Sequence, residues 1–245
     1  MRGKRRSAGL TILTVVFFLI MTVPAYAKTG WVYNGSAWNY YSADGTLAQD
    51  QWLKDGDSLF WIQGDGTMLV SEWHQDGKTW YWFDASGCAV TGWQQINGKW
   101  YYFNTNGIMA TGWISLNGEW YYLTSNGDMV TGAQTINNKE YYFTSEGVMV
   151  RGWHKENDKW KYYSPKKMSI YGRTFVEGEK VTGWLPINDK WYYIAEDGYM
   201  VTGIYKVGNR KYLFMEDGSM KTGWFKVDGT WYYISPDGEL RAQWV

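Results

Sequence analysis

A tryptophan, usually preceded by glycine, recurs along this sequence at a nearly fixed interval, and this repetition constrains the fold more than any other feature. The tryptophan or its replacement stands at Trp31, Trp52, Trp73, Trp93, Trp113, Ala133, Trp153, Trp184, Ile204, Trp224 and Trp244. The steps are 20 or 21 residues, except for one of 31 residues between Trp153 and Trp184. A period of this length is typical of a protein built from stacked repeats.

Each repeat carries the signals of a short β-hairpin. In GWQQINGKWYYFNTNGIMATGW, residues 92–113, the pair Asn97-Gly98 precedes the aromatic run Trp100–Phe103. Asn-Gly favours a two-residue hairpin turn and aromatic residues favour strands. A second turn is expected at Thr105-Asn106-Gly107, since glycine accepts a positive φ. Isolated hairpins are marginal in water, so the sequence predicts an all-β solenoid of ten stacked hairpins without helices.

The first 27 residues differ from the rest and predict a secretory signal peptide. A basic start at Arg2, Lys4, Arg5 and Arg6 is followed by an apolar run and by a small-residue site that ends at Ala27. We expect cleavage after Ala27, a repeat domain over residues 28–245, and no retained membrane span. The long step between Trp153 and Trp184 places an insertion near residues 164–178, expected to be a surface loop or a kink in the stack.

Charge and residue inventory exclude several functions. Without the leader, 20 basic residues face 24 acidic ones, which argues against nucleic acid or an anionic membrane as partner and suits a cationic ligand. His74 and His154 stand four repeats apart, Cys88 is the only cysteine, and the carboxylates occupy turn positions. We therefore predict no catalytic residues, no metal site and no cofactor, and we predict that the chain is not an enzyme.

Strand alternation sorts the rings of a repeat onto two faces. If Asn97-Gly98 is a two-residue turn, Trp93 pairs with Tyr102. One face then holds Trp93, Trp100 and Tyr102. The opposite face holds Ile96, Tyr101 and Phe103. The second is an ordinary packing face, whereas the first can also present ring faces to a ligand between hairpins.

The pattern G-W-x4-G-x-W-Y-Y-F-x3-G-x-M-x-T-G-W resembles the cell-wall-binding repeat of choline-binding proteins, which are surface proteins and autolysins of Gram-positive bacteria. The resemblance covers essentially all of residues 28–245. It implies a left-handed β-solenoid that holds choline groups of teichoic acid between hairpins. Two tryptophans of one repeat, an aromatic residue of the next and often a methionine form each site. It also implies a secreted protein attached to the bacterial cell wall.

Related repeats in glucosyltransferases and clostridial toxins bind carbohydrate, so the resemblance alone leaves choline and glucan open. A quaternary ammonium donates no hydrogen bond and is recognised by ring faces, which favours choline. A glucan would need polar groups beside a stacking platform. A host-directed adhesin and the targeting part of a wall hydrolase are further alternatives.

The repeat alignment predicts which choline sites are complete. Four sets are intact: Trp31, Trp38 and Trp61; Trp73, Trp80 and Tyr102; Trp93, Trp100 and Tyr122; and Trp113, Trp120 and Tyr142. Trp153, Trp160 and Tyr193 fit by residue type, with the insertion between them.

Four other repeats depart from the pattern. Ala133 and Glu140 replace both tryptophans of the sixth repeat, and Ile204 and Lys211 replace those of the ninth. Leu59 weakens the set of the second repeat and Leu213 that of the eighth, so Trp191 is expected to affect mainly stability. The last tryptophans, Trp224, Trp231 and Trp244, are expected to cap the stack or to contact a second copy of the chain.

Overall fold

The computed structural model describes residues 28–227, 229–238 and 240–244. The predicted signal peptide, residues 1–27, lies outside the described residues. The chain divides after Leu69 into two compact units, here called the N-terminal and C-terminal units. Among the described residues, no helix is long and apolar enough to cross a membrane.

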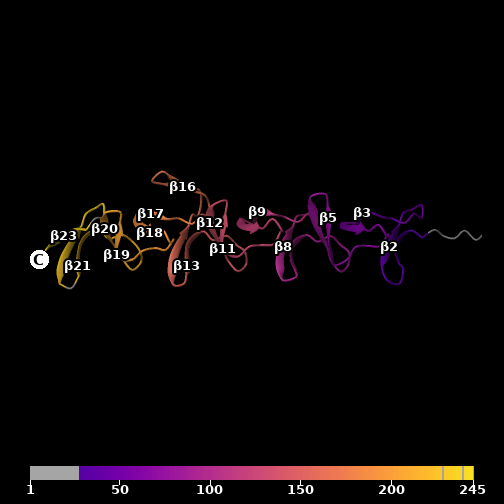
Figure 1. Cartoon of the computed structure of the whole chain (residues 1–245), viewed down its shortest axis with the longest axis horizontal. Helices are drawn as coiled ribbons and strands as arrows, with labels where there is room; N and C mark the ends of the chain where they lie inside the picture. Colours follow the sequence, from indigo (N-terminus) through magenta and orange to yellow (C-terminus); the bar gives the residue numbers. More distant parts are fainter. Residues whose placement is uncertain (1–27, 228, 239, 245) are drawn as a thin grey trace, which may run out of the picture. The chain divides into compact units, whose positions relative to one another are not determined.

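The described part of the chain is all β, as predicted, and its strands form hairpins in chain order (Figure 1). The N-terminal unit holds β1 (Gly30–Tyr33), β2 (Trp38–Tyr41), β3 (Gln51–Asp55) and β4 (Ser58–Ile62). The C-terminal unit holds β5 (Glu72–Asp76), β6 (Thr79–Phe83), β7 (Gly92–Ile96), β8 (Lys99–Phe103), β9 (Gly112–Leu116), β10 (Glu119–Leu123), β11 (Gly132–Ile136), β12 (Lys139–Phe143), β13 (Gly152–Glu156), β14 (Lys159–Tyr163), β15 (Met168–Ile170), β16 (Arg173–Phe175), β17 (Gly183–Ile187), β18 (Lys190–Ile194), β19 (Gly203–Val207), β20 (Arg210–Phe214), β21 (Gly223–Val227), β22 (Thr230–Ile234) and β23 (Leu240–Trp244). The ten predicted hairpins are present; β15–β16 is an additional hairpin, and β23 extends the β21–β22 pair to three strands.

The hairpin turns follow the predicted chemistry. Asn97 and Gly98 both have positive φ, at 50° and 79°, as a type I′ turn requires. Trp93 pairs with Tyr102 across β7 and β8, which confirms the predicted register. The turn residues therefore fix which rings of a repeat share a face.

Successive hairpins stack through one recurring contact. The amide of Met109, in the loop after β8, donates a hydrogen bond of 2.8 Å to the carbonyl oxygen of Trp80 in the preceding hairpin. The sulfur of Met109 packs on Gly127 in the next loop, where a Cβ atom would overlap it. Gly127 also has a positive φ of 85°. Glycine is needed there on both counts, and the methionine fills the gap between repeats.

The core lies on the face opposite the paired tryptophans. Phe83, Phe103, Leu123 and Phe143 stand at the same position of successive repeats and are almost completely buried. Phe103 packs with Val90 and Ile96, and Trp73 of the previous hairpin covers this cluster. The aromatic side chains therefore supply much of the buried area that short strands need.

The insertion is ordered as the β15–β16 hairpin and packs against the repeats. Phe175 is 1% exposed and lies in a cluster with Tyr162, Val181 and Leu185. Val176 packs into a different cluster, which contains Tyr141 and Met149. The insertion is therefore part of the core and not a plain surface loop.

Aromatic cages between successive hairpins

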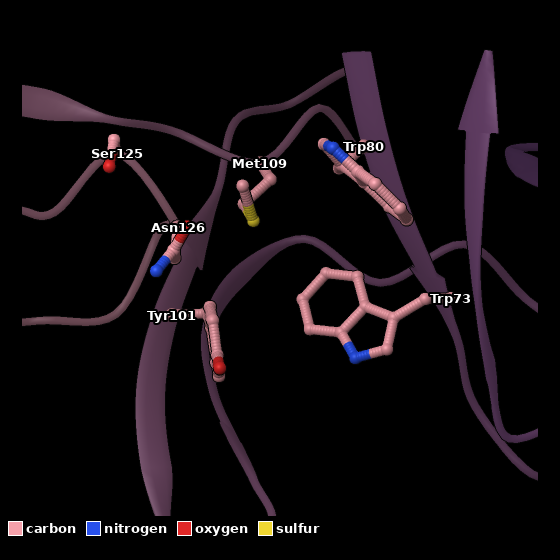
Figure 2. Close-up of a pocket in the computed structure, with 6 residues that line it drawn as sticks. All are labelled: Trp73, Trp80, Tyr101, Met109, Ser125 and Asn126. Carbon is pink, nitrogen blue, oxygen red and sulfur yellow. The ribbon is translucent and has the colours of Figure 1, made fainter.

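Three cavities of the C-terminal unit are each lined by two tryptophans, a tyrosine, a methionine and two polar residues. The first has a volume of about 300 Å³ and is lined by Trp73, Trp80, Tyr101, Met109, Ser125 and Asn126. Figure 2 shows the rings of Trp73, Trp80 and Tyr101 and the side chain of Met109 around an open space, with Asn126 on the far side. We call it the Trp73 cage.

The other two cavities use the same repeat positions. The Trp93 cage, about 410 Å³, is lined by Trp93, Trp100, Tyr121, Met129, Ser145 and Glu146. The Trp153 cage, about 290 Å³, is lined by Trp153, Trp160, Tyr192, Met200, Glu216 and Asp217. Each cage draws two tryptophans from one hairpin, a tyrosine and a methionine from the next repeat, and two turn residues from the repeat after that.

The rings of a cage meet nearly at right angles. The centroids of Trp73 and Trp80 lie 6.3 Å apart with the planes at 85°, and those of Trp73 and Tyr101 lie 5.1 Å apart at 68°. Trp80 keeps 38% of its surface exposed although Trp73 lies beside it. The geometry leaves three ring faces open to a small apolar or cationic group.

The third ring of each cage differs from the predicted one. Tyr101 lines the Trp73 cage, whereas the predicted Tyr102 packs 5.2 Å from Trp93 inside its own hairpin. Tyr122 likewise contacts Trp113, and Tyr193 contacts Trp184. The reason is geometric: the tryptophan face of one hairpin meets the opposite face of the next, and adjacent residues of a strand point to opposite faces.

The same shift applies in the N-terminal unit. Trp31 lies 4.9 Å from Phe60, and the predicted Trp61 instead packs 5.3 Å from Trp52 in its own hairpin. The amide of Met68 bonds to the carbonyl of Trp38 at 2.8 Å. The structure therefore places Phe60, rather than Trp61, opposite Trp31.

At the predicted site that contains Trp113 and Trp120, the insertion contributes to the packing. Trp113 lies 6.2 Å from Trp120 and 5.0 Å from Tyr141, as in a cage, while the predicted Tyr142 packs 4.3 Å from His154. Val176 packs in the same cluster. At the rim, Arg151 bridges Glu119 and Glu177. We call this the Trp113 junction.

Comparison with known proteins agrees with this geometry. The choline-binding repeat model matches residues 90–132, 130–168, 181–213 and 201–242, and the cell wall binding repeat model matches residues 71–87. The chain belongs to the choline-binding repeat family.

Solved structures of other choline-binding repeat proteins are similar to the chain over most of its length. CbpJ from Streptococcus pneumoniae TIGR4 is 27% identical, with a TM-score of 0.69 over 87% of this chain and 88% of that one. Choline binding protein F from Streptococcus pneumoniae, in the presence of a peptidoglycan analogue, is 28% identical, with a TM-score of 0.65 over 87% and 86%. CbpF in complex with ipratropium is 26% identical, with a TM-score of 0.63 over 87% of each chain. No curated protein sequence matched.

Sequence reasoning missed one arrangement of the choline-binding repeat type. Trp184 lies 6.2 Å from Trp191 at 85° and 4.8 Å from Tyr212 at 76°. Leu213 does not interrupt this set, because the facing residue is Tyr212. Tyr171 of the insertion also stacks on Trp191, with the centroids 5.8 Å apart. We call this group the Trp184 cage; Tyr212, on the correct face, was the signal that would have revealed it.

The sixth choline-binding repeat replaces its cage with charges. Glu140 stands at the second tryptophan position and contacts Lys180, which occupies the methionine position against Gly198. Lys161, at the tyrosine position, pairs with Glu156. Burial lowers the pKa of Lys161, but the hydrogen bond and charge of Glu156 outweigh it, so the pKa is raised overall. We call this group the charged junction. The ammonium groups of Lys161 and Lys180 stand where other repeats have a tyrosine and a methionine.

Carboxylates line the rims of two of the cages. Hydrogen bonds from the Ser219 hydroxyl and amide, and then from Lys190, lower the pKa of Asp217 from 3.8 to about 2. Hydrogen bonds from Ser145 and Thr144 lower the pKa of Glu146. Both carboxylates therefore stay charged near neutral pH. Among the described residues, no group of three or more histidine, cysteine or carboxylate side chains could hold a metal ion.

Proposed function

We propose that this protein binds choline groups of the bacterial cell wall through its aromatic cages and has no catalytic activity of its own. The observation that carries the proposal is the recurrence of two tryptophans at right angles, a third aromatic ring and a methionine at equivalent positions. The proposed ligand is choline on teichoic or lipoteichoic acid. Residues 1–27 would direct the protein out of the cell, where such polymers lie.

The chemistry of the cage favours a quaternary ammonium. Its methyl groups cannot donate hydrogen bonds, so ring faces and apolar contacts must recognise it. The Trp93 cage has Glu146 at its rim and the Trp153 cage has Asp217, which adds attraction for a cation. Ipratropium, which CbpF binds, carries a quaternary ammonium head group. A glucan is the alternative ligand.

Attachment would depend on several weak sites. A desolvated cation–π contact contributes about 2 kcal/mol, so two or three contacts in one cage give about 4 kcal/mol, and a single cage is expected to bind choline in roughly the millimolar range. Several cages on one chain can engage one polymer at once, which raises the overall affinity far above that of a single site.

A choline matrix, a tertiary-amine matrix and dextran beads separate the two ligands. We expect retention on the first two and elution by free choline. The control is a triple variant, Trp80→Ala, Trp100→Ala and Trp160→Ala, which removes an exposed ring from each of the three cavities. Retention on dextran alone would overturn the proposal. Elution of the triple variant at the same choline concentration as the unchanged protein would show that these three cages are not choline sites.

We further propose that the C-terminal repeats bind a second copy of the chain. Trp224 and Trp231 are about half exposed, at 52% and 49%, and exposed aromatic surface of this kind favours contact with another protein surface. Sedimentation with and without choline, compared with Trp224→Ala, tests the dimer, and an unchanged monomer at high concentration in both conditions would exclude it.

A further inference from the structure

A second, more polar cavity adjoins the Trp153 cage. Its volume is about 490 Å³, compared with about 290 Å³ for the cage. Trp160, Met200 and Glu216 line both cavities. A ligand in the cage and a ligand in this groove would therefore be direct neighbours, separated by one tryptophan ring and its flanking side chains.

The groove has aromatic surfaces of its own. Tyr199 and Tyr205 line it beside Trp160, and both tyrosines are partly exposed. Tyr199 follows the turn glycine, a position that holds Ile108, Asp128, Val148 or Ser219 in other repeats. No other repeat has an aromatic residue there, so the groove is a local feature of this junction and not a consequence of the repeat pattern.

Charges of both signs surround these rings. The ammonium of Lys155 lies 3.0 Å from a carboxylate oxygen of Asp158. The ammonium of Lys159 lies 5.2 Å from the ring centroid of Tyr199. Asp197 and Glu216 add two further carboxylates. An anion would meet the carboxylates and a cation would meet the lysines, so the lining suits a neutral ligand that both donates and accepts hydrogen bonds.

A pyranose ring has these properties. Its hydroxyl groups can donate to carboxylates and accept from ammonium groups, while its C–H face can pack on an aromatic ring. A groove of this volume with aromatic walls and a few polar groups is typical of small-molecule sites. The Trp153 cage is lined by three aromatic rings, a methionine and two carboxylates, whereas the groove is lined by two lysines as well as carboxylates, so the two cavities differ in chemistry.

We propose that this groove binds a neutral pyranose of the wall polymer beside the choline held in the Trp153 cage. The proposal rests on the proposed function, because the cage is taken to hold choline. A sugar and a choline group on one polymer then bind as a linked pair. We expect such a conjugate to bind this junction at least about tenfold more tightly than choline alone.

The test observes the indole N–H signal of Trp160 by NMR in the full chain, assigned with Trp160→Phe. Choline is first added to saturation, followed by methyl glucoside or N-acetylglucosamine as neutral probes. We expect a further shift of the Trp160 signal and unchanged signals for Trp73 and Trp80, because neither residue lines this groove. Choline conjugated to the sugar should then bind more tightly than free choline at this junction.

Two variants locate the sugar. Asp197→Asn keeps the acceptor for the Tyr199 amide, which lies 3.1 Å away, and removes the charge. Tyr205→Ala removes a wall, and Phe225→Ala at the same position of the next repeat is its control. We expect Asp197→Asn and Tyr205→Ala to weaken the sugar response at least about fivefold, while Phe225→Ala leaves it unchanged and all three retain the choline shift of Trp153.

The outcomes separate the two proposals. If choline shifts Trp153 and Trp160 but neither sugar adds a response, the groove proposal fails and the choline proposal stands. If sugar shifts Trp160 only before choline is added, the sugar occupies the cage and the separate groove site is excluded. If choline shifts neither tryptophan, the proposed function fails at this junction. An equal loss of sugar response in Phe225→Ala would also contradict the groove.

Discussion

The ring centroid of Trp93 lies 5.1 Å from that of Tyr121, and the two rings meet at 61°. Tyr121 is on the face of its hairpin opposite to that of Trp113 and Tyr122. The tryptophan face of one hairpin therefore meets the packing face of the next. Because adjacent residues in a strand point to opposite sides, the first tyrosine of each Tyr-Tyr pair joins a cage and the second stays within its hairpin.

This arrangement predicts opposite results for two neighbouring substitutions. Tyr121→Ala removes one ring of the Trp93 cage and should weaken choline binding there about tenfold, the value of one lost cation–π contact. Tyr122→Ala removes a ring that packs on Trp113 and should leave the affinity of the Trp93 cage within about twofold. The indole signals of Trp93 and Trp100 in a choline titration measure both. Equal losses would show that the ring assignment is wrong.

The hairpins were predictable because their determinants are local. Asn97-Gly98 fixes the turn, the turn fixes the pairing of Trp93 with Tyr102, and the aromatic run fixes the strand. The facing ring was not predictable in this way, because it depends on how one hairpin packs on another. Both Tyr101 and Tyr102 are compatible with a strand, and only the stacking distinguishes them.

The insertion shows the same limit. Its Ser-Pro start and polar residues indicate a loop, yet Phe175 is buried in the core. Val176 stands where other repeats have Ser125 or Ser145, and Tyr171 stacks on a tryptophan twenty residues later. Val176 packs with Trp113, Trp120 and Tyr141, and so joins the insertion to the fifth and sixth repeats, which do not adjoin it in the sequence.

The Trp184 cage gives a second prediction. Trp191→Ala should remove a choline site and not only reduce stability, because Trp191 stands at right angles to Trp184 beside Tyr212. The matched control is Lys211→Ala, at the same position of the ninth repeat, where no tryptophan pair exists. The Trp184 indole signal reports the site. We expect its choline response to weaken at least about tenfold in Trp191→Ala and to persist in Lys211→Ala; a full response in Trp191→Ala would exclude the site.

The charged junction predicts a stability effect without a binding effect. Glu140→Ala leaves the ammonium of Lys180, whose side chain is only 14% exposed, without its carboxylate. We expect a loss of about 1–2 kcal/mol in the free energy of unfolding, below the value for a fully buried pair because Glu140 is half exposed. Choline affinity at the Trp73 cage should not change.

The control for this prediction is a double variant. Glu140→Ala with Lys180→Met removes both charges and restores the residue that other repeats have at that position. It should recover most of the stability lost in Glu140→Ala, as measured by urea unfolding. If the double variant is less stable than the single one, Lys180 is held by contacts other than Glu140.

Val176 predicts the behaviour of the Trp113 junction. Its side chain packs in the cluster of Trp113, Trp120 and Tyr141, where the open cages have serine. Val176→Ser should make this junction more accessible, so that the Trp120 signal responds to choline at severalfold lower concentration. The reciprocal change, Ser145→Val at the Trp93 cage, should weaken choline binding there. Unchanged responses in both variants would show that this position does not control access.

The rim carboxylates predict how choline binding depends on pH. Asp217 has its pKa lowered from 3.8 to about 2 in the folded protein, so its charge and the stability it contributes are present above about pH 4 and are lost as the pH falls toward 2. Tryptophan and methionine do not titrate. The affinity of the Trp153 cage should therefore be constant between about pH 5 and 9 and should fall only in strong acid.

The Trp73 cage, which has Ser125 and Asn126 at its rim, is the internal reference and should lose less affinity in acid. Asp217→Asn should weaken the Trp153 cage at neutral pH and reduce its acid dependence, as followed by the Trp153 indole signal. A transition centred between pH 6 and 7 would instead indicate a histidine and would contradict this electrostatic account of the rim.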